Sequence, residues 1–231
     1  MKRAVILSAG LVSFAPVLAG AGEVNLNGLP TMNSGGAYTV RVLSLKEAKF
    51  RRTIQQQYDF SCGSAALATL LAYHYGDPVT ETQVFQFMYE RGDQEKIQRE
   101  GFSLLDIKNY LEAHGYNADG FETSLDKLGE VGVPAIVLIS DNGYHHFVVV
   151  KGILDGRVLV GDPSMGARII RRSEFERLWT NKIVFVITSR RDLATFNANV
   201  EWSTGIAPLG AAINRDALSS TIIFLRGVNE F

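Results

Sequence analysis

The side chains with the greatest capacity for chemistry in this sequence are one thiol, four imidazoles and a carboxylate that ends a strand-like run. Cys62 is the only cysteine among 231 residues, and it lies in the segment QQQYDFSCGSAAL where a helix-like run begins. A helix N-terminus carries partial positive charge and unpaired N–H groups, which favour a thiolate and can stabilise an oxyanion. Because many cysteines are simply buried in cores, Cys62 is either inert or a nucleophile. Its place at a helix start favours the nucleophile.

A cysteine nucleophile needs a base, and each of the four histidines has to be considered. His74 lies about three turns along the helix from the thiol, too far to contact it. His114 lies where a helix is expected to end, a position at which a histidine commonly satisfies the last carbonyls. His145 and His146 are neighbours at the start of a strand and must face opposite sides. We predict that His146, which shares its face with two valines of that strand, is the base.

The carboxylate that could orient this base is Asp162. It ends the run RVLVGD, and Pro163 directly after it stops the strand. A carboxylate at this point can accept a hydrogen bond from the imidazole, fix its tautomer and stabilise the imidazolium. An aspartate before a proline also starts turns. The partner histidine favours the catalytic role.

Composition excludes several classes of function. The chain has 23 basic and 24 acidic residues and no basic run, which argues against nucleic acid as a partner. It contains neither GxxxxGK[ST] nor GxGxxG, so no ATP site is predicted. One cysteine and four histidines without an HExxH pattern predict no metal site, and we expect no cofactor.

The first 21 residues have the features of a signal peptide. A basic start, Met1–Arg3, precedes an apolar run, Ala4–Ala19, and small residues at Ala19–Ala21. We therefore predict export, into a bacterial periplasm, with a mature chain that begins near Gly22; the alternative is a retained membrane anchor. Exported proteins usually pair their cysteines, so a single thiol in this compartment suggests that it is kept for its reactivity.

The remaining sequence predicts helices first and strands afterwards. Helical spacing is found in GSAALATLLAYHYG, ETQVFQFMYERG and SLLDIKNYLEAHG, the last two with Thr80 and Ser103 as caps, and in Ser124–Val131. The polar DQEKIQRE is predicted to be a connector. The runs PAIVLIS, HFVVVKGI, RVLVGD and ARIIRR predict antiparallel strands, followed by a helix over Ser173–Trp179 and a closing strand in KIVFVITS. This order predicts an α+β domain of two layers.

Four parts of the chain are distinguished. Residues 1–21 are the predicted signal peptide, and 22–50 form an N-terminal arm that contains the strand-like AYTVRVLSL. Residues 51–189 form the main domain. Residues 190–231 are an extension of unknown role, in which PLGAAINRDAL is helix-like and STIIFLRG is strand-like.

The spacing of these residues resembles that of the C39 peptidases, papain-like cysteine proteases that process bacteriocin-type leader peptides. The family pattern has a glutamine six residues before a Cys-Gly pair, a His-Phe pair that opens an apolar strand, and an Asp-Pro pair about sixteen residues later. This chain has Gln56, Cys62–Gly63, His146–Phe147 and Asp162–Pro163 at those spacings. The resemblance covers roughly 51–189.

The resemblance implies a papain-like fold, with N-terminal helices packed on an antiparallel sheet, and a Cys62–His146–Asp162 triad. It assigns Gln56 to the oxyanion hole, a choice among three consecutive glutamines that the residues themselves leave open. The implied activity is that of a cysteine endopeptidase that cleaves an exported peptide or unfolded protein. A standalone exported branch of the family accompanies functional-amyloid secretion systems, which makes secretion-system or amyloid subunits candidate partners.

The chain also departs from the family pattern. Typical members are fused to an ABC exporter and have an aspartate before the cysteine, where this chain has Ser61. The double-glycine leader specificity of the fused members therefore does not carry over. Two other functions stay open: a non-cleaving C39-like module that binds or chaperones a secretion substrate, and acyl transfer of the thioester to an amine.

Overall fold

The structure is a computed structural model that describes residues 22–25, 39–42, 44–141 and 143–205. The chain divides into two compact units, Met1–Ser44 and Leu45–Phe231. In the first unit, β1 (Gly22–Asn25) pairs antiparallel with β2 (Thr39–Val42), which confirms a strand within AYTVRVLSL. The predicted signal peptide and the helix-like and strand-like segments predicted in the tail lie outside the described residues.

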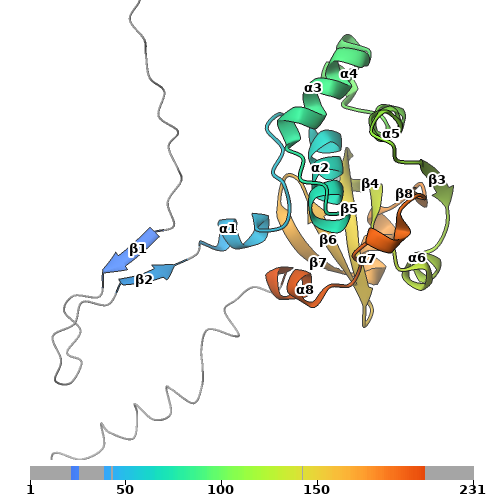
Figure 1. The fold of residues 1–231 in the computed structure, drawn as a ribbon. Coiled ribbons are helices and arrows are strands. Elements are labelled where there is room, and N and C mark those ends of the chain that lie inside the picture. The colour runs from blue at the N-terminus through green and yellow to red at the C-terminus, as the bar shows by residue number, and fades with distance from the viewer. Residues whose placement is uncertain (1–21, 26–38, 43, 142, 206–231) are drawn as a thin grey trace, which may run out of the picture. The chain divides into compact units, whose positions relative to one another are not determined.

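The second unit begins with helices (Figure 1). They are α1 (Leu45–Phe50), α2 (Cys62–His74), α3 (Glu81–Arg91), α4 (Gln94–Glu100) and α5 (Leu104–Ala113). The predicted caps are confirmed, because Thr80 and Ser103 each form a capping box with the residue three positions later. Helix α4 lies where a polar connector was expected, so that prediction was wrong. Asp93 caps α4, and its one buried residue is Ile97.

A six-stranded antiparallel sheet follows. Its strands are β3 (Ala118–Glu122), β4 (Ala135–Asp141), β5 (Tyr144–Leu154), β6 (Arg157–Asp162), β7 (Gly166–Arg171) and β8 (Ile183–Ile187). They lie in the order β3-β8-β4-β5-β6-β7. The four predicted strands of the hairpin series are confirmed as β4 to β7. The last strand, β8, lies inside the sheet between β3 and β4, and β3 was not predicted.

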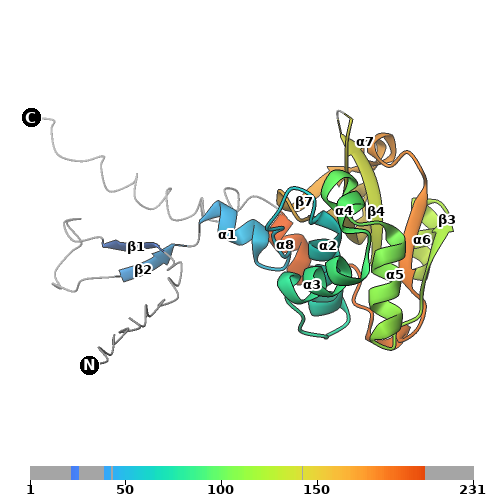
Figure 2. The same ribbon diagram turned by 90° about the horizontal axis from the view of Figure 1, so that it is seen from above.

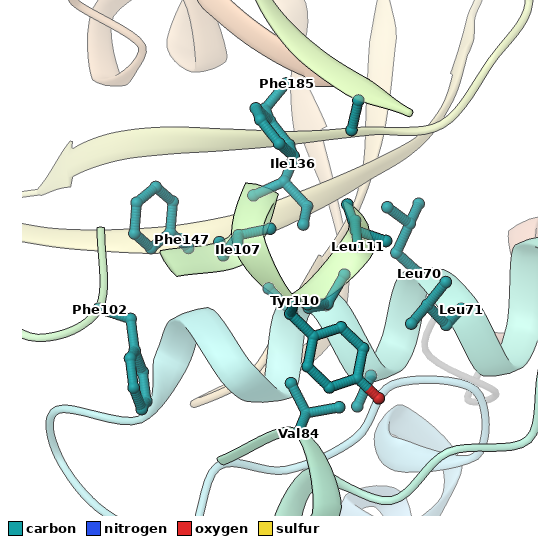
Figure 3. Close-up of a cluster of buried hydrophobic side chains, with 14 of the residues drawn as sticks. Leu70, Leu71, Val84, Phe102, Ile107, Tyr110, Leu111, Ile136, Phe147 and Phe185 are labelled. Atoms are coloured by element: carbon teal, nitrogen blue, oxygen red, sulfur yellow. The ribbon is translucent and has the colours of Figure 1, made fainter. Parts of the chain in front are cut away.

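Helices cover both faces of the sheet rather than one. The buried core on the first face joins α2 and α5 to the sheet, and Figure 3 shows Leu70 and Leu71 of α2 close to Leu111 of α5. A second core on the other face contains side chains of α6 (Leu125–Val131) and α7 (Arg172–Leu178). The two-layer expectation is corrected accordingly. Strands buried on both faces explain why their sequences are nearly continuous apolar runs.

Helix α2 is the central helix of the first layer. Apart from Ala72 and Tyr73, its residues are buried, and it lies along β5. Figures 1 and 2 show α2 between the sheet and the outer helices. Gly63 permits close packing here: an added Cβ would lie 3.5 Å from Phe147 Cδ2 of β5 and 3.0 Å from Phe102 Cβ, just before α5. The packing fixes the start of α2 against the start of β5.

The chain continues beyond the sheet with a short segment that packs back on it. A 3-10 turn (Arg191–Leu193) leads to α8 (Asn199–Gly205), which contacts β6 and β7. Asn197 anchors the segment, because its side chain bonds both backbone groups of Ile153. Among the described residues, no helix is both long enough and apolar enough to span a membrane.

Candidate active site

Cys62 is the first residue of α2 and is held by a compact turn. Ser61 forms no side-chain cap; its hydroxyl accepts from the Tyr58 amide and donates to the Tyr58 carbonyl, both at 3.1 Å. Ser64 donates to the Ser61 carbonyl at 2.8 Å. These bonds tie the backbone on either side of the thiol. The nucleophile candidate is therefore held in a rigid setting, with 7% of its surface exposed.

The electrostatics of this thiol differ from the sequence-based expectation. Burial raises the pKa of Cys62, and hydrogen bonds from the backbone N–H groups of Phe147, Gly63 and Cys62 itself lower it without offsetting that cost. The helix N-terminus alone therefore does not produce a thiolate, because desolvation of the charged sulfur outweighs it. The Phe147 contact also places the sulfur beside the residue that follows His146. Ionisation of this thiol has to be assisted by a base.

His146 and Asp162 are in direct contact. Nε2 of the imidazole lies 3.2 Å from Oδ2 of the carboxylate, and both side chains are buried. The other oxygen, Oδ1, accepts from the amide and hydroxyl of Ser164 and from the Met165 amide. Burial would raise the pKa of Asp162, but the bonds from His146 and Ser164 outweigh it and hold that pKa at about 2. This carboxylate is ionised throughout the physiological range.

The second ring nitrogen of His146, Nδ1, is buried and has no hydrogen-bond partner among the described residues. With Nε2 fixed by Asp162 as the donor, the neutral ring presents Nδ1 as an acceptor. The adjacent backbone N–H, that of Phe147, contacts the sulfur of Cys62. The nucleophile candidate and the base candidate are therefore neighbours in the fold, through the residue that follows His146.

The other three histidines are placed elsewhere. His145 is exposed, as expected for the opposite side of the strand. His114 ends α5 and contacts the Tyr110 carbonyl at 2.7 Å, which confirms its expected place at a helix end. His74 is buried at the far end of α2 and contacts the Thr195 carbonyl at 2.7 Å.

Gln56 connects the nucleophile loop to the turn after Asp162. Its backbone N–H donates to the Pro163 carbonyl at 3.0 Å. Its side-chain amide donates to the carbonyls of Tyr58 at 3.0 Å and of Asp59 at 3.5 Å. The Gln56 side chain also forms a hydrogen bond with Tyr144, so its NH₂ group is already engaged, and the role of Gln56 in an oxyanion hole stays a prediction.

Two residues outside the predicted triad and oxyanion hole contact His146 or Asp162. Arg168 Nη1 lies 3.3 Å from Oδ2 of Asp162, the same oxygen that His146 contacts. Tyr144 stacks on the His146 ring with centroids 5.3 Å apart. Alternation could have indicated both, because Tyr144 and His146 are two apart on β5, and the β6–β7 register puts Arg168 opposite Val160 on the face of Asp162.

Comparison with known proteins identifies the family. Residues 51–191 match the peptidase C39 family. The chain belongs to this family. It is 41% identical over 160 residues to the probable functional amyloid protease FapD of Pseudomonas aeruginosa, which covers 69% of this chain and 70% of FapD. It is 38% identical over 167 residues to FapD of Pseudomonas fluorescens, covering 72% of each chain.

The fold likeness extends to a solved structure. The peptidase domain of Streptococcus ComA, a bi-functional ABC transporter of a quorum sensing pathway, superposes with a TM-score of 0.50 and 18% identity, covering 59% of this chain and 96% of that domain. The predicted papain-like α+β fold is confirmed, and the protein is a cysteine peptidase. Within the described residues, no cluster of His, Cys, Asp and Glu could hold a metal ion.

Proposed function

We propose that this C39 peptidase is a periplasmic endopeptidase in which Cys62, His146 and Asp162 form the catalytic triad. His146 Nδ1 takes the proton of Cys62, and the thiolate attacks the scissile carbonyl to form a tetrahedral oxyanion. The Cys62 N–H and the Gln56 amide stabilise that oxyanion. The imidazolium then protonates the leaving amine as the C–N bond breaks, and water hydrolyses the thioester and regenerates the thiol.

The observation that supports this proposal is the buried His146–Asp162 contact, which leaves Nδ1 without a partner, next to Phe147, whose N–H contacts the Cys62 sulfur. A carboxylate with a pKa of about 2 stabilises an imidazolium at neutral pH. Because burial raises the pKa of the thiol, its ionisation depends on forming an ion pair with that imidazolium. The ionised Asp162 carboxylate therefore supplies the stabilised imidazolium that the buried Cys62 thiol needs in order to ionise.

The engagement of the Gln56 amide with the carbonyls of Tyr58 and Asp59 is compatible with this role. An amide NH₂ has two donor hydrogens, and the bond to Asp59 is long at 3.5 Å. When a substrate oxygen develops negative charge, a charged acceptor competes favourably with a neutral carbonyl at that distance. We propose that Gln56 turns one hydrogen from Asp59 to the oxyanion.

The proposed substrate is an exported protein of an amyloid secretion system, cleaved in the periplasm. Support comes from the signal-peptide features of residues 1–21 and from the similarity to the proteases named FapD.

The test compares the exported protein fractions of cells that carry wild type, Cys62→Ala, His146→Ala or His145→Ala, by N-terminal sequencing. We expect a new N-terminus in one exported protein that is lost with the Cys62 and His146 variants. His145→Ala is the matched control, since it removes the exposed neighbour and should keep cleavage. Identical N-termini with Cys62→Ala would contradict proteolysis and favour the non-cleaving module. A new amide in place of a free carboxylate would indicate acyl transfer.

A further inference from the structure

Tyr144 connects the two sides of the candidate active site. It is the first residue of β5, and its hydroxyl donates to the Asp59 carbonyl at 3.2 Å. Its ring stacks on the imidazole of His146, with centroids 5.3 Å apart and planes inclined by 30°. One side chain therefore contacts the loop that leads to Cys62 and covers the base.

These contacts are close in the chain to both Cys62 and His146. Asp59 comes three residues before Cys62, and Tyr144 comes two residues before His146. The nucleophile belongs to the helical layer and the base to the sheet, so the sulfur–imidazole distance depends on how the two layers are held. The Tyr144–Asp59 hydrogen bond joins them within three residues of both groups.

A second backbone contact ties the same loop at its other end. The Gln56 N–H donates to the Pro163 carbonyl, directly after Asp162. The loop from Gln56 to Cys62 is thus bonded to β5, which carries His146, and to the residue directly after β6, which ends at Asp162. The Pro163 contact is made by main chain, whereas the Tyr144 contact depends on one hydroxyl group and can be removed by substitution.

We propose that Tyr144 is a positioning residue of this peptidase: its hydroxyl holds the Cys62 loop against β5, and its ring holds the His146 imidazole in the orientation that faces the thiol. The inference rests on the proposed Cys62–His146 pair. Burial raises the pKa of Tyr144, and the charges of Cys62 and of Asp59 and Asp162 raise it further against a hydrogen bond with Gln56, so the phenol stays a protonated donor at neutral pH.

Tyr144 contributes little to the hydrophobic core. Half of Tyr144 is exposed, at 50%, so its removal takes little apolar surface out of the core. The two variants that separate its functions are Tyr144→Phe, which keeps the ring and loses the hydrogen bond, and Tyr144→Leu, which loses both. We expect the melting temperature of each to stay within about 3 °C of wild type.

The control is Tyr116→Phe. Tyr116 donates its hydroxyl to the carboxylate oxygen Asp77 Oδ2 at 3.1 Å, a length close to that of the Tyr144 bond to a backbone carbonyl, and Asp77 lies beyond the far end of α2 from Cys62. Tyr116 is buried, with 5% exposed, so its loss tests whether any tyrosine hydrogen bond affects the thiol through general loosening.

The readout is alkylation of Cys62 by iodoacetamide in the full chain, followed by intact mass spectrometry at pH 6 and pH 9.5. The thiolate is the reacting species. At pH 6 a buried thiol reacts only to the extent that His146 accepts its proton, whereas at pH 9.5 solvent hydroxide increasingly replaces that base. The ratio of the two rates therefore measures activation by His146 and cancels changes in access.

We expect Tyr144→Phe to lower this ratio roughly fivefold, the factor that corresponds to one neutral hydrogen bond, and Tyr144→Leu to lower it further. Tyr116→Phe should keep the wild-type ratio, and His146→Ala sets the floor. If His146→Ala leaves the ratio unchanged, the proposed triad fails. If His146→Ala lowers it and Tyr144→Phe does not, the triad stands and the positioning role of Tyr144 is overturned.

Discussion

Replacement of Glu201 by Gln should be among the most destabilising single changes in this chain, although Glu201 lies ten residues beyond the stretch that matches the family. The Glu201 carboxylate accepts from Lys151 Nζ at 3.0 Å and from Arg52 Nε. The side chains of Lys151 and Glu201 are both 0% exposed. The ammonium also donates to the Arg52 carbonyl, so the substitution leaves a buried cation with neutral acceptors alone.

Two arguments set the magnitude. Removing one partner of a buried ion pair costs about 3–5 kcal/mol, because the other charge stays desolvated. The lysine can escape by losing its proton, which from an ordinary pKa of 10.5 costs about 5 kcal/mol at pH 7, at 1.36 kcal/mol per pH unit. Deprotonation therefore caps the loss, and we expect Glu201→Gln to lower the free energy of unfolding by about 3–5 kcal/mol at pH 7.

Because deprotonation of Lys151 limits the loss, the stability of the Glu201→Gln variant should depend on pH. Burial lowers the pKa of Lys151 even with Glu201 present, and Glu201 raises it, so loss of this carboxylate should lower that pKa further. The unfolded variant then binds the lysine proton over a range in which the folded variant has released it. Stability of the variant then rises with pH. At pH 9 deprotonation costs only about 2 kcal/mol, so the gap to wild type should shrink to about that value.

The measurement is urea denaturation of wild type and Glu201→Gln at both pH values. The matched control is Glu130→Gln, which removes the exposed partner of Lys127 in a pair of 2.9 Å and should change stability by less than about 0.5 kcal/mol. Adding Lys151→Met to Glu201→Gln removes the stranded charge and should recover at least half of the loss. A loss below about 1 kcal/mol at pH 7, or one that does not shrink at pH 9, would refute the reasoning.

Three further changes have defined outcomes. Asp162→Asn should lower kcat/KM on the cleaved substrate roughly 10²- to 10⁴-fold, since the amide no longer stabilises the imidazolium of His146. Arg168→Met should lower it less than about tenfold, because His146 and Ser164 still hold the carboxylate. Burial, with Lys151 nearby, lowers the pKa of His74 from 6.5 to about 4, so stability should fall by about 3 kcal/mol as pH drops through that window. Urea denaturation at pH 7 and pH 4.5 should show this component in wild type and not in His74→Gln.

The sequence could select candidate site residues, but it could not predict the environment of their side chains. Cys62, His146 and Asp162 could be selected because Cys62 begins a helix, Asp162 ends a strand, and His146 lies near the start of a strand whose side chains alternate between two faces. The raised pKa of Cys62 could not be predicted, since it depends on how closely α2 packs on β5. Gln56 was chosen by spacing; in the structure Gln57 bonds to Thr82 and Gln55 is exposed.

The missed elements share a physical cause. β3 has the sequence ADGFE, in which only Ala118 is buried, so neither alternation nor an apolar run marks it as a strand. Its pairing with β8 comes from tertiary structure. Helix α4 has one buried residue, Ile97, and is too polar for the periodicity argument. In both, local sequence contributes little, and packing against neighbours decides the conformation.

The partner of the buried Lys151 lies in the C-terminal extension, residues 190–231, and could not be selected from the sequence. Lys151 is a charged residue inside the apolar run HFVVVKGI, and a cation within a buried strand requires an anion nearby. That need could be predicted, but the chain has 24 acidic residues and nothing local selects one. The selected residue is Glu201, fifty positions later and beyond the family match. Since Lys151 is on the strand of His146 and its stem covers Gly161, next to Asp162, the segment that carries Glu201 supports the two strands of the acid–base pair. A chain cut at the family boundary would keep Cys62, His146 and Asp162 and lose the partner of this buried lysine.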